Sequence, residues 1–212
     1  MDNNVSGGPI TSAAFIDGSY PCACWSATTS ASVDAAAVRA ALVAVCGGSL
    51  EVAYYFDARY ADGSGREALR CAMARQDFRV KANYRIVWEW VRDELGNVVR
   101  DRSGRIVTRA CQKGVDVGLA LTLDRSQRAV GWTRLALVAG DGDFAEIVQE
   151  LVEGRGVELI LIGCGRSTSL DLLPYAVKFV EVSTLMTYAT PARVPSAALI
   201  AGPRNSLTGV AS

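Results

Sequence analysis

Short apolar runs and longer segments with helical spacing alternate along most of this chain. The short runs are bounded by Asp or Gly and are typical of buried strands; they cover 12–16, 50–56, 135–139 and 157–163. The longer segments predict helices that begin at Ser32 or Asp34 and end near Val45, and further helices at 65–77, 115–125 and 144–153. Strands that alternate with helices predict right-handed βαβ units and a mainly parallel sheet.

The segment from Phe78 to Cys111 breaks this alternation. Residues 85–92 alternate between apolar and polar, and turn residues follow at Leu95-Gly96-Asn97 and Ser103-Gly104. We predict a β-hairpin insertion around 84–111 within one α/β domain that spans 12–185. Pro and Gly residues recur in 186–212, which predicts a flexible C-terminal tail. No internal repeat is apparent.

Composition limits the class of protein. The chain has 212 residues, half of them hydrophobic, and 22 basic residues balance 22 acidic ones, as in a globular domain. It contains no apolar run of the ~20 residues needed to cross a bilayer, and its first residues lack the features of a signal peptide. We therefore expect a cytoplasmic protein that does not associate with membranes.

The sequence contains no histidine. Catalysis by Ser-His-Asp or Cys-His groups and metal sites with histidine ligands are therefore excluded. The six cysteines are scattered through apolar segments, which fits reduced thiols better than a disulfide framework. Acid-base or metal chemistry in this chain must use carboxylates, Lys, Tyr or Cys.

Carboxylates follow three of the predicted strands, at Asp17, Asp57 and Asp141, and Asp143 comes two residues later. Asp116 adds a carboxylate in the first turn of a predicted helix. Each could simply cap a helix or interact with its dipole. Because parallel strands share one carboxyl edge, these groups could also converge, and clustered carboxylates repel unless a hard cation such as Mg²⁺ or Mn²⁺ binds there. Such a site suits phosphodiester hydrolysis.

Three motifs in order resemble a known family. Phe15-Ile16-Asp17-Gly18-Ser19, Lys113-Gly114-Val115-Asp116-Val117 and Val138-Ala139-Gly140-Asp141-Gly142-Asp143-Phe144 are similar to motifs of the NYN domains, LabA-like branch, in the PIN-like nuclease superfamily. The resemblance implies a Rossmann-like three-layer α/β/α sandwich and metal-dependent ribonuclease activity with Mg²⁺ or Mn²⁺. It also implies that Asp17, Asp116, Asp141 and Asp143 are the catalytic and metal-binding residues.

Two positions depart from the family pattern. Tyr20 stands where the family has Asn, and Val177 stands where it has Asp. The alternative is therefore a catalytically degraded module of the same fold that binds RNA or a protein. A haloacid dehalogenase-type phosphatase is a weaker alternative, because Phe15 occupies the position of its nucleophilic aspartate.

Positive charge is concentrated in the middle of the chain. From Arg66 to Arg109 there are eleven basic and six acidic residues, a net charge of +5. We expect this segment to hold single-stranded RNA, with Trp88, Trp90 or Tyr84 stacking on bases. The same aromatics would also suit a core or a homodimer contact. The candidate substrate-binding residues are Ser19, Tyr20, Lys113, Arg100, Arg102 and Arg105.

Overall fold

The computed structural model describes residues 10–21, 33–59 and 67–189. Within these ranges, seven strands form one sheet in the order β4-β3-β2-β1-β5-β6-β7, and neighbouring strands are parallel except for β3 and β4. The strands are β1 (Ser12–Asp17), β2 (Leu50–Arg59), β3 (Arg79–Trp90), β4 (Thr108–Lys113), β5 (Arg134–Val138), β6 (Glu158–Gly163) and β7 (Ala176–Glu181). The α-helices are α2 (Ala35–Cys46), α3 (Glu67–Arg75), α4 (Val115–Val130), α5 (Ala145–Gln149) and α6 (Val182–Ala189).

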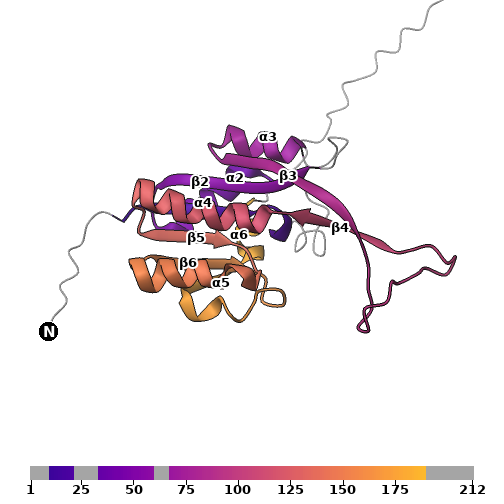
Figure 1. The fold of residues 1–212 in the computed structure, drawn as a ribbon. Coiled ribbons are helices and arrows are strands. Elements are labelled where there is room, and N and C mark those ends of the chain that lie inside the picture. The colour runs from indigo at the N-terminus through magenta and orange to yellow at the C-terminus, as the bar shows by residue number, and fades with distance from the viewer. Residues whose placement is uncertain (1–9, 22–32, 60–66, 190–212) are drawn as a thin grey trace, which may run out of the picture.

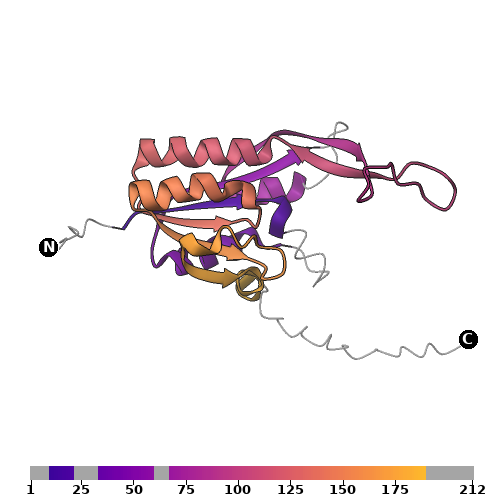
Figure 2. The same cartoon turned by 60° about the horizontal axis from the view of Figure 1, so that its bottom comes forward.

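Helices cover both faces of the sheet, which confirms the α/β/α sandwich (Figure 1). On one face, α2, α3 and α6 pack on residues such as Ile16 and Tyr55. On the other face, α4 and α5 pack on residues such as Phe15 and Phe56 (Figure 2). Successive side chains of a strand alternate between these two cores, as strand geometry requires. We call the second face the α4 face.

Local sequence signals account for the helix boundaries. The Asp34 carboxylate caps α2 by accepting a hydrogen bond from the backbone N–H of Ala36 at 2.9 Å. Gly47 ends the same helix with φ 74°, a conformation that favours glycine. Beyond η1 (Gly142–Phe144), a single 3-10 turn, α5 continues into one π-helical turn, η2 (Glu150–Gly154). Together these three elements fill the predicted helix at 144–153.

The strand order places a topological switch point between β1 and β5. The chain moves outward from β1 through β2 to β3 and β4, and then returns to β5 on the other side of β1. Ligands of open α/β sheets bind where the strand order reverses, beyond the carboxyl ends of the strands. Asp17 is the last residue of β1 and Asp141 follows β5 closely, so both lie at this point.

The predicted hairpin is an arm that we define as residues 85–113. Its β3 half is continuous with the sheet, because β3 first pairs parallel with β2 and then antiparallel with β4. Because β3 runs in the same direction as β1, the arm extends from the same edge of the sheet as Asp17. Figure 1 shows it projecting well beyond the helical layers.

The end of the arm consists of two copies of an eight-residue unit. Val-Arg-Asp-Glu-Leu-Gly-Asn-Val at 91–98 is followed by Val-Arg-Asp-Arg-Ser-Gly-Arg-Ile at 99–106. Three backbone hydrogen bonds join the first residues of the two units, Val91 and Val99, with Val107 in a ring. The Val99 N–H donates to the Val91 carbonyl, the Val107 N–H to the Val99 carbonyl, and the Val91 N–H to the Val107 carbonyl. The expectation that the chain contains no internal repeat was therefore wrong.

Each unit stabilises its own turn with polar contacts. Asp93 accepts hydrogen bonds from the N–H groups of Leu95 and Asn97, and Asp101 accepts the equivalent bonds from Ser103 and Arg105. The pKa of the Asp93 carboxyl is lowered mainly by the bond from the Asn97 N–H, and the pKa of the Asp101 carboxyl mainly by the Ser103 hydroxyl, which donates to Asp101 Oδ1 at 2.7 Å. The arginine at the second position of each unit also donates to the glycine carbonyl of that unit. Arg92 donates to Gly96 at 2.7 Å and Arg100 to Gly104 at 2.8 Å.

Two elements at the C-terminal end were not predicted. β7 forms an edge of the sheet, and α6 packs beside α2 in the core that contains Ile16. α6 extends four residues past the predicted domain boundary at 185, so the predicted tail begins inside a helix, and residues 190–212 lie outside the described ranges. Among the described helices, none is long and apolar enough to span a membrane.

Candidate acidic active site

Asp17 forms the centre of the site because β1 ends there in the middle of the sheet. It is 6 % exposed and lies on the α4 face, since it follows the same alternation as Phe15 and pairs with Phe56 in register. The N–H and the hydroxyl of Ser19 both donate to Asp17 Oδ1, at 2.9 and 2.7 Å. These two bonds fix the orientation of the carboxylate.

Asp141 and Asp143 enter the site from the turn after β5. Asp141 caps η1, because its Oδ1 accepts a hydrogen bond from the Asp143 N–H at 3.0 Å. The helix-capping role is therefore confirmed for Asp141. Capping engages one oxygen of the carboxylate, and both Asp141 and Asp143 are exposed to solvent at the carboxyl edge.

Asp116 lies in the first turn of α4, directly after the arm. Gly114 adopts φ 81° before the helix, which lets the chain turn sharply from β4 into α4. Burial raises the pKa of the Asp116 carboxyl above its ordinary value, and the negative charges of Asp17, Asp141 and then Asp143 raise it further. The structure thus brings the four predicted aspartates into one electrostatically coupled group.

The chemistry of this donor set fits a hard divalent cation, because the ligands offered are carboxylate oxygens and their mutual repulsion would be relieved by positive charge. Within the part of the chain that the structure describes, no three Asp, Glu or Cys side chains already converge as a ligating group. A cation would therefore have to draw these carboxylates closer together.

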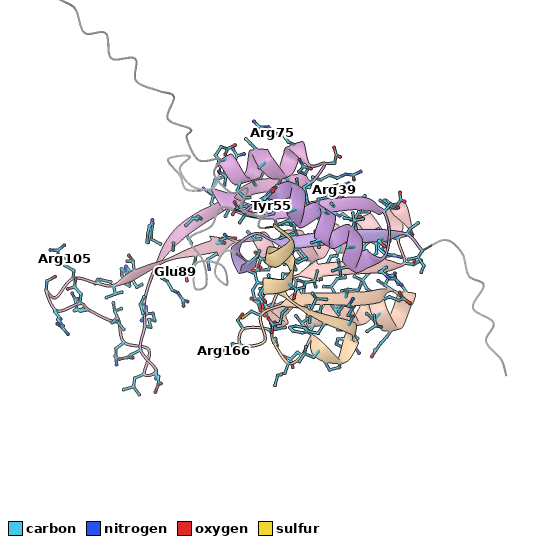
Figure 3. All side chains as sticks on the ribbon, turned by 180° about the vertical axis from the view of Figure 1, so that it is seen from behind. Arg39, Tyr55, Arg75, Glu89, Arg105 and Arg166 are labelled. Atoms are coloured by element: carbon cyan, nitrogen blue, oxygen red, sulfur yellow. The ribbon has the colours of Figure 1, made fainter. Side chains whose placement is uncertain are left out.

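An open cleft of about 890 Å³ lies beside Asp17 and Asp141. Its far wall is the loop after β6, which contributes Cys164 and the residues from Arg166 to Ser169. Arg166 is exposed and lies at this wall, and Figure 3 shows it at the edge of the domain on the side from which the arm projects. The cleft thus combines carboxylates on one side with a guanidinium on the other.

Tyr20 connects the two walls of the cleft. Its hydroxyl oxygen accepts a hydrogen bond from the Cys164 N–H at 2.7 Å and contacts Thr168 Oγ1 at 2.8 Å. Its ring lies so close to Gly140 that a Cβ there would come within 2.2 Å of it. Tyr20 therefore holds the loop after β6 against the turn that carries Asp141.

Comparison with known proteins identifies the family. The model of the NYN domain matches residues 12–183. The chain belongs to the NYN domain family. NYN domains are part of the PIN-like nuclease superfamily. No curated protein matches the chain.

One solved structure similar to this NYN domain is that of a protein of unknown function from Vibrio parahaemolyticus RIMD 2210633. The two chains are 21% identical, the match covers 81% of this chain and 92% of the other, and the TM-score is 0.53. At this identity the likeness shows a common fold. The LabA-like branch within the family stays a prediction.

Asp57 does not join the acidic group of the NYN domain. It lies one residue beyond the position that pairs with Asp17, so its side chain faces α3 rather than α4. There it is fully buried, and its Oδ2 pairs with Nη1 of Arg70 at 3.1 Å. The three strand-end aspartates could have converged, but Asp57 does not join the other two, because neighbouring positions of a strand point to opposite faces.

The departure at Val177 lies away from the acidic edge. Ala176 pairs with Leu159 and Lys178 with Ile160, at the beginning of β6, whereas the carboxyl end of that strand is Gly163. At ~3.3 Å per residue, Val177 is about 10–13 Å short of this edge. The absence of an acidic residue at position 177 therefore does not change the set of carboxylates at the carboxyl edge of the sheet.

The predicted basic residues lie on the arm rather than in the cleft. Lys113 Nζ contacts Glu89 Oε1 at 2.6 Å at the base of the arm. Arg100 is bonded to its own turn, while Arg102 and Arg105 are exposed near the end, and Figure 3 shows Arg105 at the far end of the arm. These residues can contact only a ligand that extends beyond the cleft.

Two residues of the cleft region were missed at the sequence level. Arg166 follows the Gly163-Cys164-Gly165 turn at the end of β6, and a glycine-rich turn after a predicted parallel strand could have placed it at the same edge as Asp141. Asp171 accepts a hydrogen bond from the Ser169 hydroxyl at 3.1 Å, and its carboxylate faces Gly142. Nothing in the local pattern distinguishes Asp171 from an ordinary turn residue.

Proposed function

We propose that this NYN domain is a metal-dependent ribonuclease that hydrolyses RNA phosphodiester bonds at the aspartate cluster. The observation that carries the proposal is the coupling of Asp116 to Asp17, Asp141 and Asp143 at the switch point of the sheet. A half-buried carboxyl whose pKa is raised by burial and by three neighbouring aspartates, at the edge of the sheet where ligands bind, is costly to the fold, and a function for it explains the cost.

Asp17, Asp116, Asp141 and Asp143 would hold Mg²⁺ or Mn²⁺. The cation would supply activation of a water molecule and neutralisation of charge on the phosphate. The chain's own residues orient these ligands: Ser19 fixes Asp17 with two hydrogen bonds, and the Asp143 N–H fixes Asp141. These bonds limit the orientations that the two carboxylates can adopt, so a cation would have less conformational freedom to remove from them when it draws the group together.

Arg166 is the group on the opposite wall that suits a phosphate. A guanidinium can donate two parallel hydrogen bonds to a phosphate, and its charge offsets the repulsion between the RNA backbone and the aspartates. The loop that carries it is tied to Tyr20 through Cys164 and Thr168. Tyr20 thereby acts as a positioning residue for the phosphate side of the cleft.

The test is cleavage of end-labelled single-stranded RNA by the purified full-length protein in Mn²⁺, in Mg²⁺ and in EDTA. We expect cleavage that requires the cation and that is lost in Asp141→Asn. Asp77→Asn is the matched control: Asp77 is an exposed aspartate with φ 57°, a conformation that asparagine tolerates, and it lies in the turn between α3 and β3. Equal loss in both variants would contradict the proposed site.

The second candidate is a domain that binds RNA or a protein without cutting it. It is favoured by Tyr20, because its hydroxyl is engaged by the loop after β6 where the family pattern has an amide. In the same assay, wild type and Asp141→Asn would then be equally inert in every cation while both retain RNA binding. That result would refute the nuclease proposal and leave the binding function.

A further inference from the structure

Trp88 and Trp90 are exposed on the arm. Their side chains are 63 % and 57 % exposed, whereas Trp132 in the domain is fully buried. The residues directly opposite on β4 are small, with Ala110 across from Trp88 and Thr108 across from Trp90. Side chains at i and i+2 of a strand project from the same face, so the two indoles lie next to each other, and the small side chains of β4 beside them leave the ring faces accessible.

This surface belongs to the same face of the sheet as Asp17. Tyr84 pairs with Ala58, and Tyr84 and Ile86 pack into the core under α4. The alternation continues along β3 to Trp88 and Trp90. The tryptophans therefore extend the α4 face, which also carries Asp17, past the carboxyl edge of the sheet.

The distance between Asp17 and Trp88 along the strands suits a nucleic acid strand that continues from the cleft onto the arm. Phe56 is level with Asp17, Ala58 is level with Tyr84, and Trp88 lies four residues beyond Tyr84. Six residues at ~3.3 Å each put Trp88 about 20 Å beyond Asp17 along the strand direction. At a stacked rise of ~3.4 Å this is about six nucleotides, and fewer in an extended strand.

Charge favours a polyanion over a second copy of this chain. The arm contains seven basic and four acidic residues, and Arg102 and Arg105 are exposed near its end. Two arms packed through their tryptophans would bring two positively charged surfaces together. The hydrogen-bonded turns of the eight-residue units keep the arm ordered before a ligand binds, which lowers the entropy cost of binding.

We propose that Trp88 and Trp90 form a nucleobase-stacking subsite for the single-stranded flank of an RNA whose phosphate backbone occupies the acidic cleft. This inference rests on the proposed function, because it takes the cleft as the RNA site. Stacking on aromatic rings is tolerant of base identity, so the subsite recognises single-strandedness rather than sequence. A paired duplex presents no free base faces to these rings.

The experiment measures binding of single-stranded RNA of about twelve nucleotides, long enough for the ~20 Å span, to full-length Asp141→Asn by fluorescence anisotropy. The companion measurement is cleavage of a dinucleotide, which cannot reach the arm, by the otherwise wild-type protein. The variants are Trp88→Ala, Trp90→Ala, Trp88→Phe and, as an arm control, Leu95→Ala, whose side chain is 87 % exposed. Light scattering of each variant reports its oligomeric state.

We expect each Trp→Ala change to weaken binding by about five- to a hundred-fold, Trp88→Phe to retain most of the affinity, and Leu95→Ala to bind as the parent does. Dinucleotide cleavage should be unchanged in all four variants. Full affinity in both Trp→Ala variants would overturn the subsite. A wild-type dimer that becomes monomeric in Trp88→Ala would overturn it in favour of a self-interface.

The two proposals fail separately. If the dinucleotide is cleaved but the Trp→Ala variants bind the longer RNA normally, the subsite is refuted and the nuclease proposal stands. If no RNA is cleaved in any cation but the Trp→Ala variants lose affinity, the nuclease proposal is refuted and the subsite stands.

Discussion

Replacing Tyr20 with phenylalanine separates a role in holding the cleft from a role in contacting RNA. Thr168 donates its own hydroxyl proton to the Cys164 carbonyl at 2.9 Å, so Tyr20 is the donor to Thr168 Oγ1 and the acceptor for the Cys164 N–H. Tyr20→Phe removes these two bonds, and also the one that the Ser167 hydroxyl donates to the Tyr20 hydroxyl at 3.3 Å, without changing the ring that packs against Gly140. The Cys164 N–H then loses this hydrogen bond in a half-buried position.

Loss of a hydrogen bond made by a half-buried donor costs about 1–3 kcal/mol. For a chain of this size that predicts a fall in Tm of about 2–12 °C. We therefore expect Tyr20→Phe to be less stable in thermal unfolding and to exchange the Cys164 amide hydrogen faster. RNA binding should weaken only to the extent that loosening of the loop displaces Arg166.

Tyr175→Phe is the matched control, since Tyr175 is half-buried in η3 (Leu173–Tyr175) and does not line the cleft. The reasoning is refuted if Tyr20→Phe keeps the wild-type Tm and the wild-type exchange rate at Cys164. If RNA affinity then falls without any loss of stability, the hydroxyl contacts the RNA directly.

Three further predictions test other parts of the structure. Arg70→Met removes the cation that pairs with buried Asp57 and should lower the free energy of unfolding by about 3–5 kcal/mol in urea titrations, with no specific effect on cation dependence. Arg102→Ala together with Arg105→Ala should reduce the slope of log K against log salt by about 1.4, measured with single-stranded RNA; an unchanged slope would remove both from the RNA site. Arg166→Gln should weaken binding of short RNA by about ten-fold while Tm stays close to that of the wild type; normal affinity would exclude a phosphate contact.

The sheet and its helices could be predicted because their signals are local. Asp34 and Gly47 mark the two ends of α2 within a few residues of sequence, and both act in the structure as the sequence indicates. β7 was missed because it is an edge strand in which Val177, Lys178 and Phe179 are all exposed, so its residues show neither alternation nor a continuous apolar run.

The choice between Asp17 and Asp57 could not be made from sequence. Both follow apolar runs, and the strands that carry them are buried on both faces, so hydrophobicity does not reveal which face each position occupies. The face depends on the register between β1 and β2, which places Asp17 level with Phe56 and Asp57 one residue beyond. One residue of register decides whether a carboxylate lies in the acidic cleft or in an ion pair with Arg70.

The arm shows a different limit of hydrophobic patterning. Its two eight-residue units bury no core of their own, so the repeat appears in turn chemistry, with an aspartate and a glycine three residues apart in each copy. Asp93 and Asp101 order their turns through backbone N–H groups, while the side chains left at the surface include Trp88, Trp90 and Arg105. A segment that is ordered by its own polar contacts and presents aromatic and basic groups to solvent contributes little to the stability of the domain. The aromatic and basic side chains on its surface are therefore best explained by what they bind, which is why the arm and the acidic cleft are to be tested together.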